Sequence, residues 1–173
     1  MSLTPAQLYA EHVAAWGVLW ESGFEVTGRP DVAAVVNSSL YFILSSVRED
    51  TLHSLSPGGL ASNGYNGHTF WDCETWMYPA LLLWHPGIAQ SLLQYRINNV
   101  KEAQAKALSY NKSYTGAMFP WESGATGSEV CPSWASTGQL EQVRTGIVDY
   151  SLISVPWPAP KSMNALFAKP WNF

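Results

Sequence analysis

The stretch TPAQLYAEHVAAWGVLWESG, residues 4–23, decides the fold class because it has every feature of one amphipathic helix. Thr4 followed by Pro5 is typical of a helix start, where a hydroxyl caps the first turn and proline needs no N–H partner. Large apolar side chains then recur at i, i+4, i+7 and i+11, namely Tyr9, Val13, Trp16 and Trp20. Gly23 ends the pattern, so a helix is predicted over 4–23.

Three further segments carry the same period. Pro30 is typical of a first helical turn, and the apolar pattern after it predicts a helix over 30–48. A shorter helix is predicted over 74–84, bending or restarting near Pro79, because proline is tolerated only early in a helix. A fourth is predicted over 86–109. Together these segments predict an all-α fold.

Two long loops rich in Gly, Ser and Asn are predicted over 51–69 and 111–132. Long loops within a domain commonly carry function, so we expect both on one common side. Residues 133–173 contain clustered prolines and no sustained period, which predicts an irregular, poorly packed tail. We therefore divide the chain into a helical part, residues 1–132, and a divergent tail, residues 133–173.

Composition limits the class of protein. Of 173 residues 47% are hydrophobic and only 13% are charged, which excludes disorder of the whole chain and suggests that it leans on further protein. The net charge of −4, without any block of Lys or Arg, argues against a nucleic-acid partner. No apolar run approaches the ~20 residues of a membrane span, and the N-terminus lacks a signal-peptide pattern. We expect a cytoplasmic protein without a membrane partner; the sequence leaves the oligomeric state open.

Tryptophan is unusually frequent, with nine residues, and aromatic residues make up 13% of the chain. Aromatic rings stack on the C–H faces of sugars, while Trp and Tyr also offer a polar tip. The same composition would suit a tryptophan-rich core. Composition alone therefore leaves carbohydrate binding and core packing as alternatives.

The first candidate site lies in GYNGHTFWDCETWMYP, residues 64–79. Asp72 directly precedes a predicted helix, whose N-terminal dipole favours an ionised carboxylate. That carboxylate could accept hydrogen bonds from two vicinal sugar hydroxyls while the indole of Trp71 covers the sugar ring. The alternative is that Asp72 only caps the helix.

The second candidate site lies in GAMFPWES, residues 116–123, and continues to GSEVCP, residues 127–132. Glu122 could bind sugar or could accept hydrogen bonds from loop amides. Glu129 is expected to be solvated. The histidines form no HExxH or His/Cys ligand spacing, so we expect no metal, and no phosphate-binding or dinucleotide signature predicts a cofactor.

The first segment resembles the signature of glycoside hydrolase family 65, in which Gly-His-x-Phe-Trp-Asp-x-Glu precedes an aromatic residue, Met and Pro. The second segment resembles the next signature of that family, and its Cys-Pro ending is similar to the animal branch. The opening helix and the run Leu92-Leu93-Gln94-Tyr95-Arg96 also fit. Order and spacing agree over residues 1–132, about three quarters of the chain.

The resemblance implies part of an (α/α)6 barrel and hydrolysis with inversion at an α-glucosidic bond. The animal branch removes glucose from the glucosyl-galactosyl disaccharide on collagen hydroxylysine, so the implied partner is a small sugar or a glycopeptide. Trp71 and Asp72 would hold the glucose in the −1 subsite, and Glu122 would be a further binding residue.

The resemblance also places the general acid in a later Asp-Glu-Tyr-His segment, which the 173 residues do not contain. We therefore assign no catalytic residue and expect a truncated glycosidase without turnover. Two alternatives stay open: a non-catalytic carbohydrate-binding or regulatory isoform, and a helical module without sugar contact.

The purified 173-residue chain should therefore release no glucose from glucosyl-galactosyl-hydroxylysine, trehalose or kojibiose. A positioned acid supplies roughly 10²–10⁴-fold of the rate, and an inverting enzyme needs a second carboxylate to aim the water. A coupled glucose assay against a heat-killed control measures this. Release that disappears in Glu122→Gln would contradict the prediction and identify the missing acid.

Overall fold

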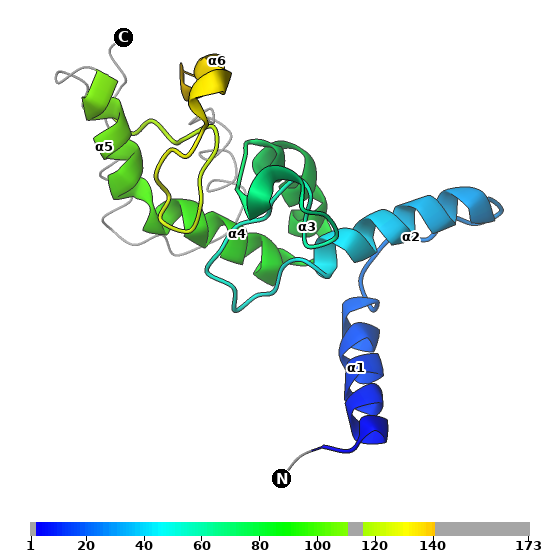
Figure 1. The fold of residues 1–173 in the computed structure, drawn as a ribbon. Coiled ribbons are helices and arrows are strands. Elements are labelled where there is room, and N and C mark those ends of the chain that lie inside the picture. Colours follow the sequence, from blue (N-terminus) through cyan, green and yellow to red (C-terminus); the bar gives the residue numbers. More distant parts are fainter. Residues whose placement is uncertain (1–2, 111–115, 141–173) are drawn as a thin grey trace.

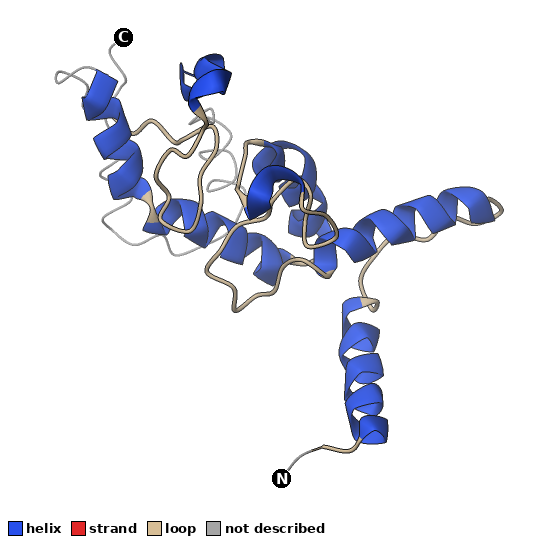
Figure 2. Cartoon of the chain, in the orientation of Figure 1, coloured by secondary structure: helices blue, strands red, loops and turns tan. Residues whose placement is uncertain are grey.

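The computed structural model describes residues 3–110 and 116–140, and these form an all-α structure (Figure 2). The α-helices are α1 (Pro5–Leu19), α2 (Pro30–Leu44), α3 (Tyr78–Trp84), α4 (Pro86–Asn98), α5 (Val100–Tyr110) and α6 (Ser136–Leu140). Short turns of 3-10 or π type are Gly64–Gly67, Cys73–Met77 and Ser133–Ala135. The described part contains isolated β-bridges but no strand, which confirms the predicted fold class. None of these helices combines the length and apolarity needed to cross a membrane.

Helices α1 and α2 extend away from the body formed by α3, α4 and α5 (Figure 1). Thr4 caps α1 as predicted, in a reciprocal pair of hydrogen bonds with Gln7. No residue of α1 is buried, although Trp16 packs on the edge of the core and stacks on Tyr41 at 4.9 Å. Helix α2 ends at Leu44, short of the predicted end. Many apolar side chains of both helices lie exposed.

The core lies where the C-terminal end of α2 meets α3, α4 and the loop that connects α2 to α3. Leu81 of α3 and Ala89 of α4 are completely buried. The remaining members of this cluster are Leu40, Leu44, Val47, Leu55, Cys73, Tyr78, Ile88, Leu92 and Leu93. Burying each large aliphatic side chain contributes about 1.5–3 kcal/mol, so this cluster fixes the body on which the two loops rest.

The helix predicted over 86–109 is two helices, α4 and α5, which meet at Asn99. The Asn99 side chain donates to the carbonyl of Tyr95 at 2.8 Å, and its N–H is shared between the carbonyls of Tyr95 and Arg96. A side chain that competes for backbone acceptors interrupts the regular ladder, so the helix bends at this residue. The predicted restart near Pro79 is confirmed, since the π-type turn becomes α3 at Tyr78.

Residues 133–140 form two short helical segments, where the sequence predicted irregular structure. They pack on the second loop: Gln139 donates to the carbonyl of Cys131 at 3.1 Å, and Tyr110 donates to the carbonyl of Gln139 at 2.6 Å. Because tertiary contacts rather than a helical period order this segment, the local pattern gave no signal for it. The rest of the predicted tail, residues 141–173, lies outside the described residues.

One buried ion pair joins α4 to the π-type turn. The Arg96 side chain is 1% exposed and the Glu74 side chain 3% exposed, and two hydrogen bonds of 2.6 and 3.2 Å link guanidinium to carboxylate. Burial alone would lower the pKa of Arg96, but the charge and hydrogen bonds of Glu74 outweigh it and raise that pKa. The guanidinium therefore stays charged in the fold and depends on the Glu74 carboxylate as its partner.

Glu74→Gln should destabilise the protein by about 3–5 kcal/mol, because it leaves the guanidinium of Arg96 buried without a counter-charge. The double variant Glu74→Met with Arg96→Met should recover most of this loss, since it removes both charges. Urea unfolding followed by circular dichroism measures each free energy of unfolding.

The matched control is Asp50→Asn, which breaks the exposed ion pair between Arg48 and Asp50. Exposed pairs contribute about 0–1 kcal/mol, so this variant should unfold almost as the wild type does. A Glu74→Gln variant as stable as Asp50→Asn would show that the buried pair does not support the fold.

Candidate active site

The two sequence segments that carry the candidate residues meet in space. The N–H of Thr69 donates to the carbonyl of Ser123 at 2.8 Å, and the N–H of Ser123 donates to the carbonyl of Thr69 at 3.0 Å. Both residues are buried, at 3% and 1% exposure. This reciprocal pair joins loops that are more than fifty residues apart in sequence. It confirms the expectation that the described parts of both loops share one side.

Two side chains of helix α4 donate hydrogen bonds to the segments that meet at this junction. The guanidinium of Arg96 donates to the carbonyl of Phe70 and to the hydroxyl of Ser123, both at 3.4 Å, besides binding Glu74. Tyr95 donates to the same serine hydroxyl at 2.9 Å. Two adjacent residues of one helix therefore hold both loops, and the loops cannot shift independently.

Aromatic side chains cover the junction. The Phe70 ring makes edge contacts with Tyr65 at 5.4 Å and with Trp121 at 5.1 Å between centroids. Trp71 is partly buried, packs against the small cluster of Ala103 and Phe119, and lies 6.0 Å from the Trp76 ring. Trp76 itself is 66% exposed. Two neighbouring indoles, one anchored in the core and one open, offer a surface on which a sugar ring could stack.

A left-handed turn precedes the junction. Tyr65, Asn66 and Gly67 have φ angles of 62°, 54° and 72°, a region that only glycine adopts without cost. The N–H of His68 closes the turn by donating to the carbonyl of Tyr65 at 2.8 Å. A non-glycine aromatic residue in this conformation indicates strain held by its surroundings, which is frequent at binding sites.

Asp72 is half-buried, directly follows Trp71 and lies at the start of the π-type turn. Its carboxylate makes no capping hydrogen bond to that turn. Within residues 3–110 and 116–140, no other hydrogen bond or ion pair engages it either. The capping alternative is therefore wrong, and the carboxylate is free to accept hydrogen bonds from a ligand.

Glu122 is only 6% exposed and forms a pair with His68, with Oε1 2.8 Å from the ring Nδ1. Its carboxylate accepts no hydrogen bond from loop amides among the described residues, so the alternative role that the sequence left open for Glu122 is wrong. The structure thus brings Glu122 to the same junction as Trp71 and Asp72, with all three residues in the joined segments.

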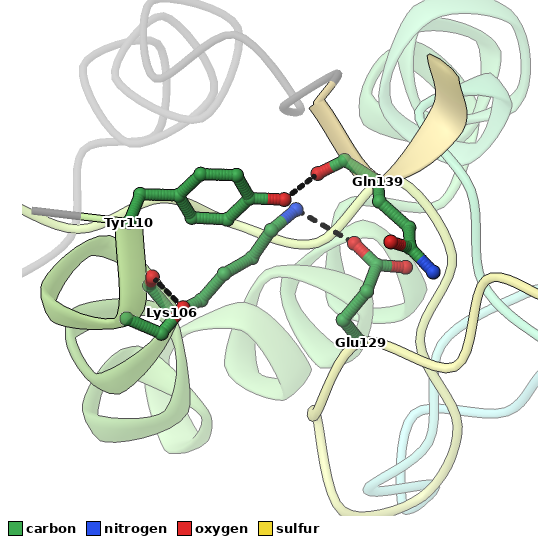
Figure 3. Close-up of a pocket in the computed structure, with 5 residues that line it drawn as sticks. Lys106, Tyr110, Glu129 and Gln139 are labelled. Atoms are coloured by element: carbon green, nitrogen blue, oxygen red, sulfur yellow. Dashed lines mark hydrogen bonds and ion pairs between the residues drawn. The ribbon is translucent and has the colours of Figure 1, made fainter. Parts of the chain in front are cut away.

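Glu129, rather than Glu122, accepts the hydrogen bonds of the loop amides. The expectation that Glu129 is solvated is therefore wrong. Its two carboxylate oxygens accept from the N–H groups of Trp121, Glu122 and Cys131 at 3.1–3.2 Å, and Lys106 donates to Oε2 at 2.6 Å. The bend at Asn99 directs α5 toward this loop, which a linear pattern could not reveal. Figure 3 shows this ion pair in a pocket of about 240 Å³ whose lining residues are Lys106, Ser109, Tyr110, Glu129 and Gln139.

Two buried residues next to Asp72 are structural. Glu74 forms a buried ion pair with Arg96. The signal in the sequence that could have revealed this pair is Arg96 itself, a lone arginine on the apolar face of a predicted helix. Burial, followed by the neighbouring Glu74 charge, raises the pKa of the Cys73 thiol to about 12, so it is not a nucleophile near neutral pH. No three His, Cys, Asp or Glu side chains gather as metal ligands within the described residues.

Comparison with known proteins agrees with the sequence resemblance. The glycosyl hydrolase family 65 central catalytic domain matches residues 37–146. A protein-glucosylgalactosylhydroxylysine glucosidase of Dictyostelium discoideum is 57% identical over 79% of this chain and 19% of its own length. A kojibiose hydrolase of Flavobacterium johnsoniae is 45% identical over 83% of this chain and 21% of its own length. The chain therefore spans about a fifth of the length of these relatives.

A solved structure described as that of a kojibiose phosphorylase from human microbiome shares the fold, with a TM-score of 0.73. The similarity covers 87% of this chain and 21% of that structure, at 22% identity. The described helices thus correspond to part of the family's (α/α)6 catalytic domain, as the resemblance implied.

Glu129→Ala should speed hydrogen exchange of the Trp121, Glu122 and Cys131 amides by at least tenfold. Each amide loses a charged acceptor, and such hydrogen bonds contribute about 1.5–3 kcal/mol. Exchange followed by NMR or mass spectrometry measures the effect. Glu25→Ala, at an exposed position that no described contact involves, is the control. Unchanged exchange in Glu129→Ala would show that this carboxylate does not hold the loop.

Proposed function

The chain belongs to glycosyl hydrolase family 65, and we propose that its two joined loops form part of the site for a terminal α-linked glucose. The observation that carries this proposal is the Asp72 carboxylate, which has no protein partner within the described residues and directly follows Trp71, whose indole is anchored. An unpaired carboxylate and an aromatic ring on adjacent residues suit a ligand that offers hydroxyl donors and a C–H face.

Trp71 and Asp72 divide the recognition of the glucose ring. An ionised carboxylate has two acceptor oxygens, so Asp72 can accept from two vicinal hydroxyls at once. Trp71 is held on one side by the Ala103 and Phe119 cluster, so its ring needs no reorganisation to receive a sugar. A rigid contact of this kind limits the entropy lost on binding.

Glu122 is the third binding residue of the proposal. It is buried beside the reciprocal backbone pair of Thr69 and Ser123, so its carboxylate keeps a fixed place relative to the Trp71 segment. One oxygen faces His68, and the other remains as an acceptor for a further hydroxyl. Glu74 and Glu129 have no such role, because Arg96 and three loop amides occupy them.

We propose that the reaction of the whole protein is hydrolysis with inversion, removing glucose from a glucosyl-galactosyl unit on hydroxylysine. The relative of highest identity described above is named for that substrate, and the kojibiose hydrolase is named for another sugar with a terminal glucose. An inverting hydrolase needs an acid and a base about 6.5–9.5 Å apart. The proposal assigns the carboxylates of these loops to sugar binding and none of them to proton transfer.

Asp72→Asn should weaken binding of glucosyl-galactose and of kojibiose by about 10–100-fold, with the fold intact. The amide replaces an acceptor oxygen by a donor and removes the charge, and a hydrogen bond to a charged group contributes about 1.5–3 kcal/mol. Calorimetric titration of the 173-residue chain measures affinity, and circular dichroism with thermal melting checks the fold.

Asp31→Asn is the matched control, because Asp31 is an exposed carboxylate on α2 that pairs only with Arg29 among the described residues. Its affinity for sugar should equal that of the wild type. Equal affinity in Asp72→Asn, or no sugar binding by the wild-type chain, would refute the proposed site.

A further inference from the structure

His68 is a polar residue at the junction whose role neither the fold nor the proposed sugar site has yet explained. It lies between the left-handed turn and the Thr69–Ser123 backbone pair, so both of its flanks are held. Its side chain is 28% exposed, whereas that of Glu122 is 8% exposed. The imidazole is thus the more exposed member of the pair and covers part of the buried Glu122 carboxylate.

The contact between the two side chains bears on which ring nitrogen carries a hydrogen. A carboxylate can only accept, so we assign the hydrogen of this contact to the Nδ1 atom, which lies 2.8 Å from Glu122 Oε1. The opposite edge of the ring lies beside Gly124, with Cδ2 3.8 Å and Nε2 4.0 Å from the place of a β-carbon there. The ring is therefore fixed at Nδ1 by Glu122, and its opposite edge faces a position that carries no side chain.

The second carboxylate oxygen of Glu122, Oε2, has no hydrogen-bond partner in the described part of the chain. Glu122 is more than nine-tenths buried, yet Oε2 accepts no hydrogen bond from the described residues, and it is not sealed from solvent. Because Oε2 reaches solvent, a hydroxyl of a ligand can take the place of water at this acceptor. The geometry thus leaves one acceptor position open for a group that the protein does not supply.

We propose that His68 is a positioning residue, which holds Glu122 through Oε1 so that Oε2 faces a hydroxyl of the bound sugar. This inference rests on the proposed function and extends it by one residue. The carboxylate otherwise has a rotatable side chain, and a fixed donor on one oxygen sets the direction of the other.

The other charged groups around this pair are already matched. Glu129 accepts the N–H of Glu122 at 3.2 Å and is paired with Lys106. Arg96, which reaches the adjacent Ser123, is paired with Glu74. Within the described residues, the side-chain donor to Glu122 is therefore His68 itself.

The first test reads the tautomer of His68 in the 173-residue chain without sugar, by nitrogen-15 NMR of the imidazole at a pH where the ring is neutral. We expect hydrogen on Nδ1, and we expect Glu122→Ala to shift the ring toward the Nε2–H form. His53, which is exposed, provides an internal reference in the same spectra. Hydrogen on Nε2 in the wild type would overturn the inference.

The second test compares two substitutions by calorimetric titration with glucosyl-galactose. His68→Phe keeps a ring but has no donor, and its affinity should fall at least tenfold. His68→Asn places an amide N–H near the former Nδ1 and should stay within about threefold of the wild type, as a hydrogen-bond role demands and mere ring packing does not. The same two substitutions at His53 should change nothing.

The outcomes separate the two proposals. Equal affinity in His68→Phe and the wild type overturns the inference, as does a failure of His68→Asn to restore binding. If His68→Phe does not fold, the wild-type tautomer and the His68→Asn affinity decide. An Nδ1–H tautomer in a wild-type chain that binds no sugar overturns the proposed function instead.

Discussion

The buried guanidinium of Arg96 is the constraint on which the other features depend. A charge without solvent is stable only when counter-charge and acceptors surround it, and here these come from two segments far apart in sequence. Glu74 supplies the counter-charge, while the carbonyl of Phe70 and the hydroxyl of Ser123 accept the remaining donors. One side chain of α4 therefore dictates where the π-type turn and both loops must lie.

This arrangement divides the acidic residues of the junction into two groups. Glu74 and Glu129 are consumed by the fold, the first by a buried cation and the second by loop amides and Lys106. Asp72 keeps both carboxylate oxygens, and Glu122 keeps one, without a partner in the described part of the chain. Since these acceptor oxygens reach solvent, hydroxyls of a ligand can replace water at them, and this division is compatible with the sugar site proposed at the junction.

Sequence patterns predicted some features of the fold correctly and missed others, and each outcome has a physical reason. The starts of α1 and α2 were predicted correctly because capping residues and proline act locally, whereas both helices end four residues before their predicted ends, at Leu19 and Leu44. The bend at Asn99 was missed, since asparagine is tolerated in helices and interrupts one only when its side chain takes a backbone carbonyl. Residues 133–140 were missed because contacts with the second loop order them. Glu129 was misjudged because its partner Lys106 arrives through that bend.

The sequence by itself determined the helical class and the two long loops, because period and capping are written along the chain, and its resemblance to the family nominated Trp71 and Asp72 as binding residues. Only the tertiary structure decided which carboxylates are occupied and which remain free. That distinction depends on partners far apart in sequence, such as Arg96 for Glu74 and His68 for Glu122. A carboxylate has the same letter in either role, and burial together with a counter-charge from another element gives it one role or the other.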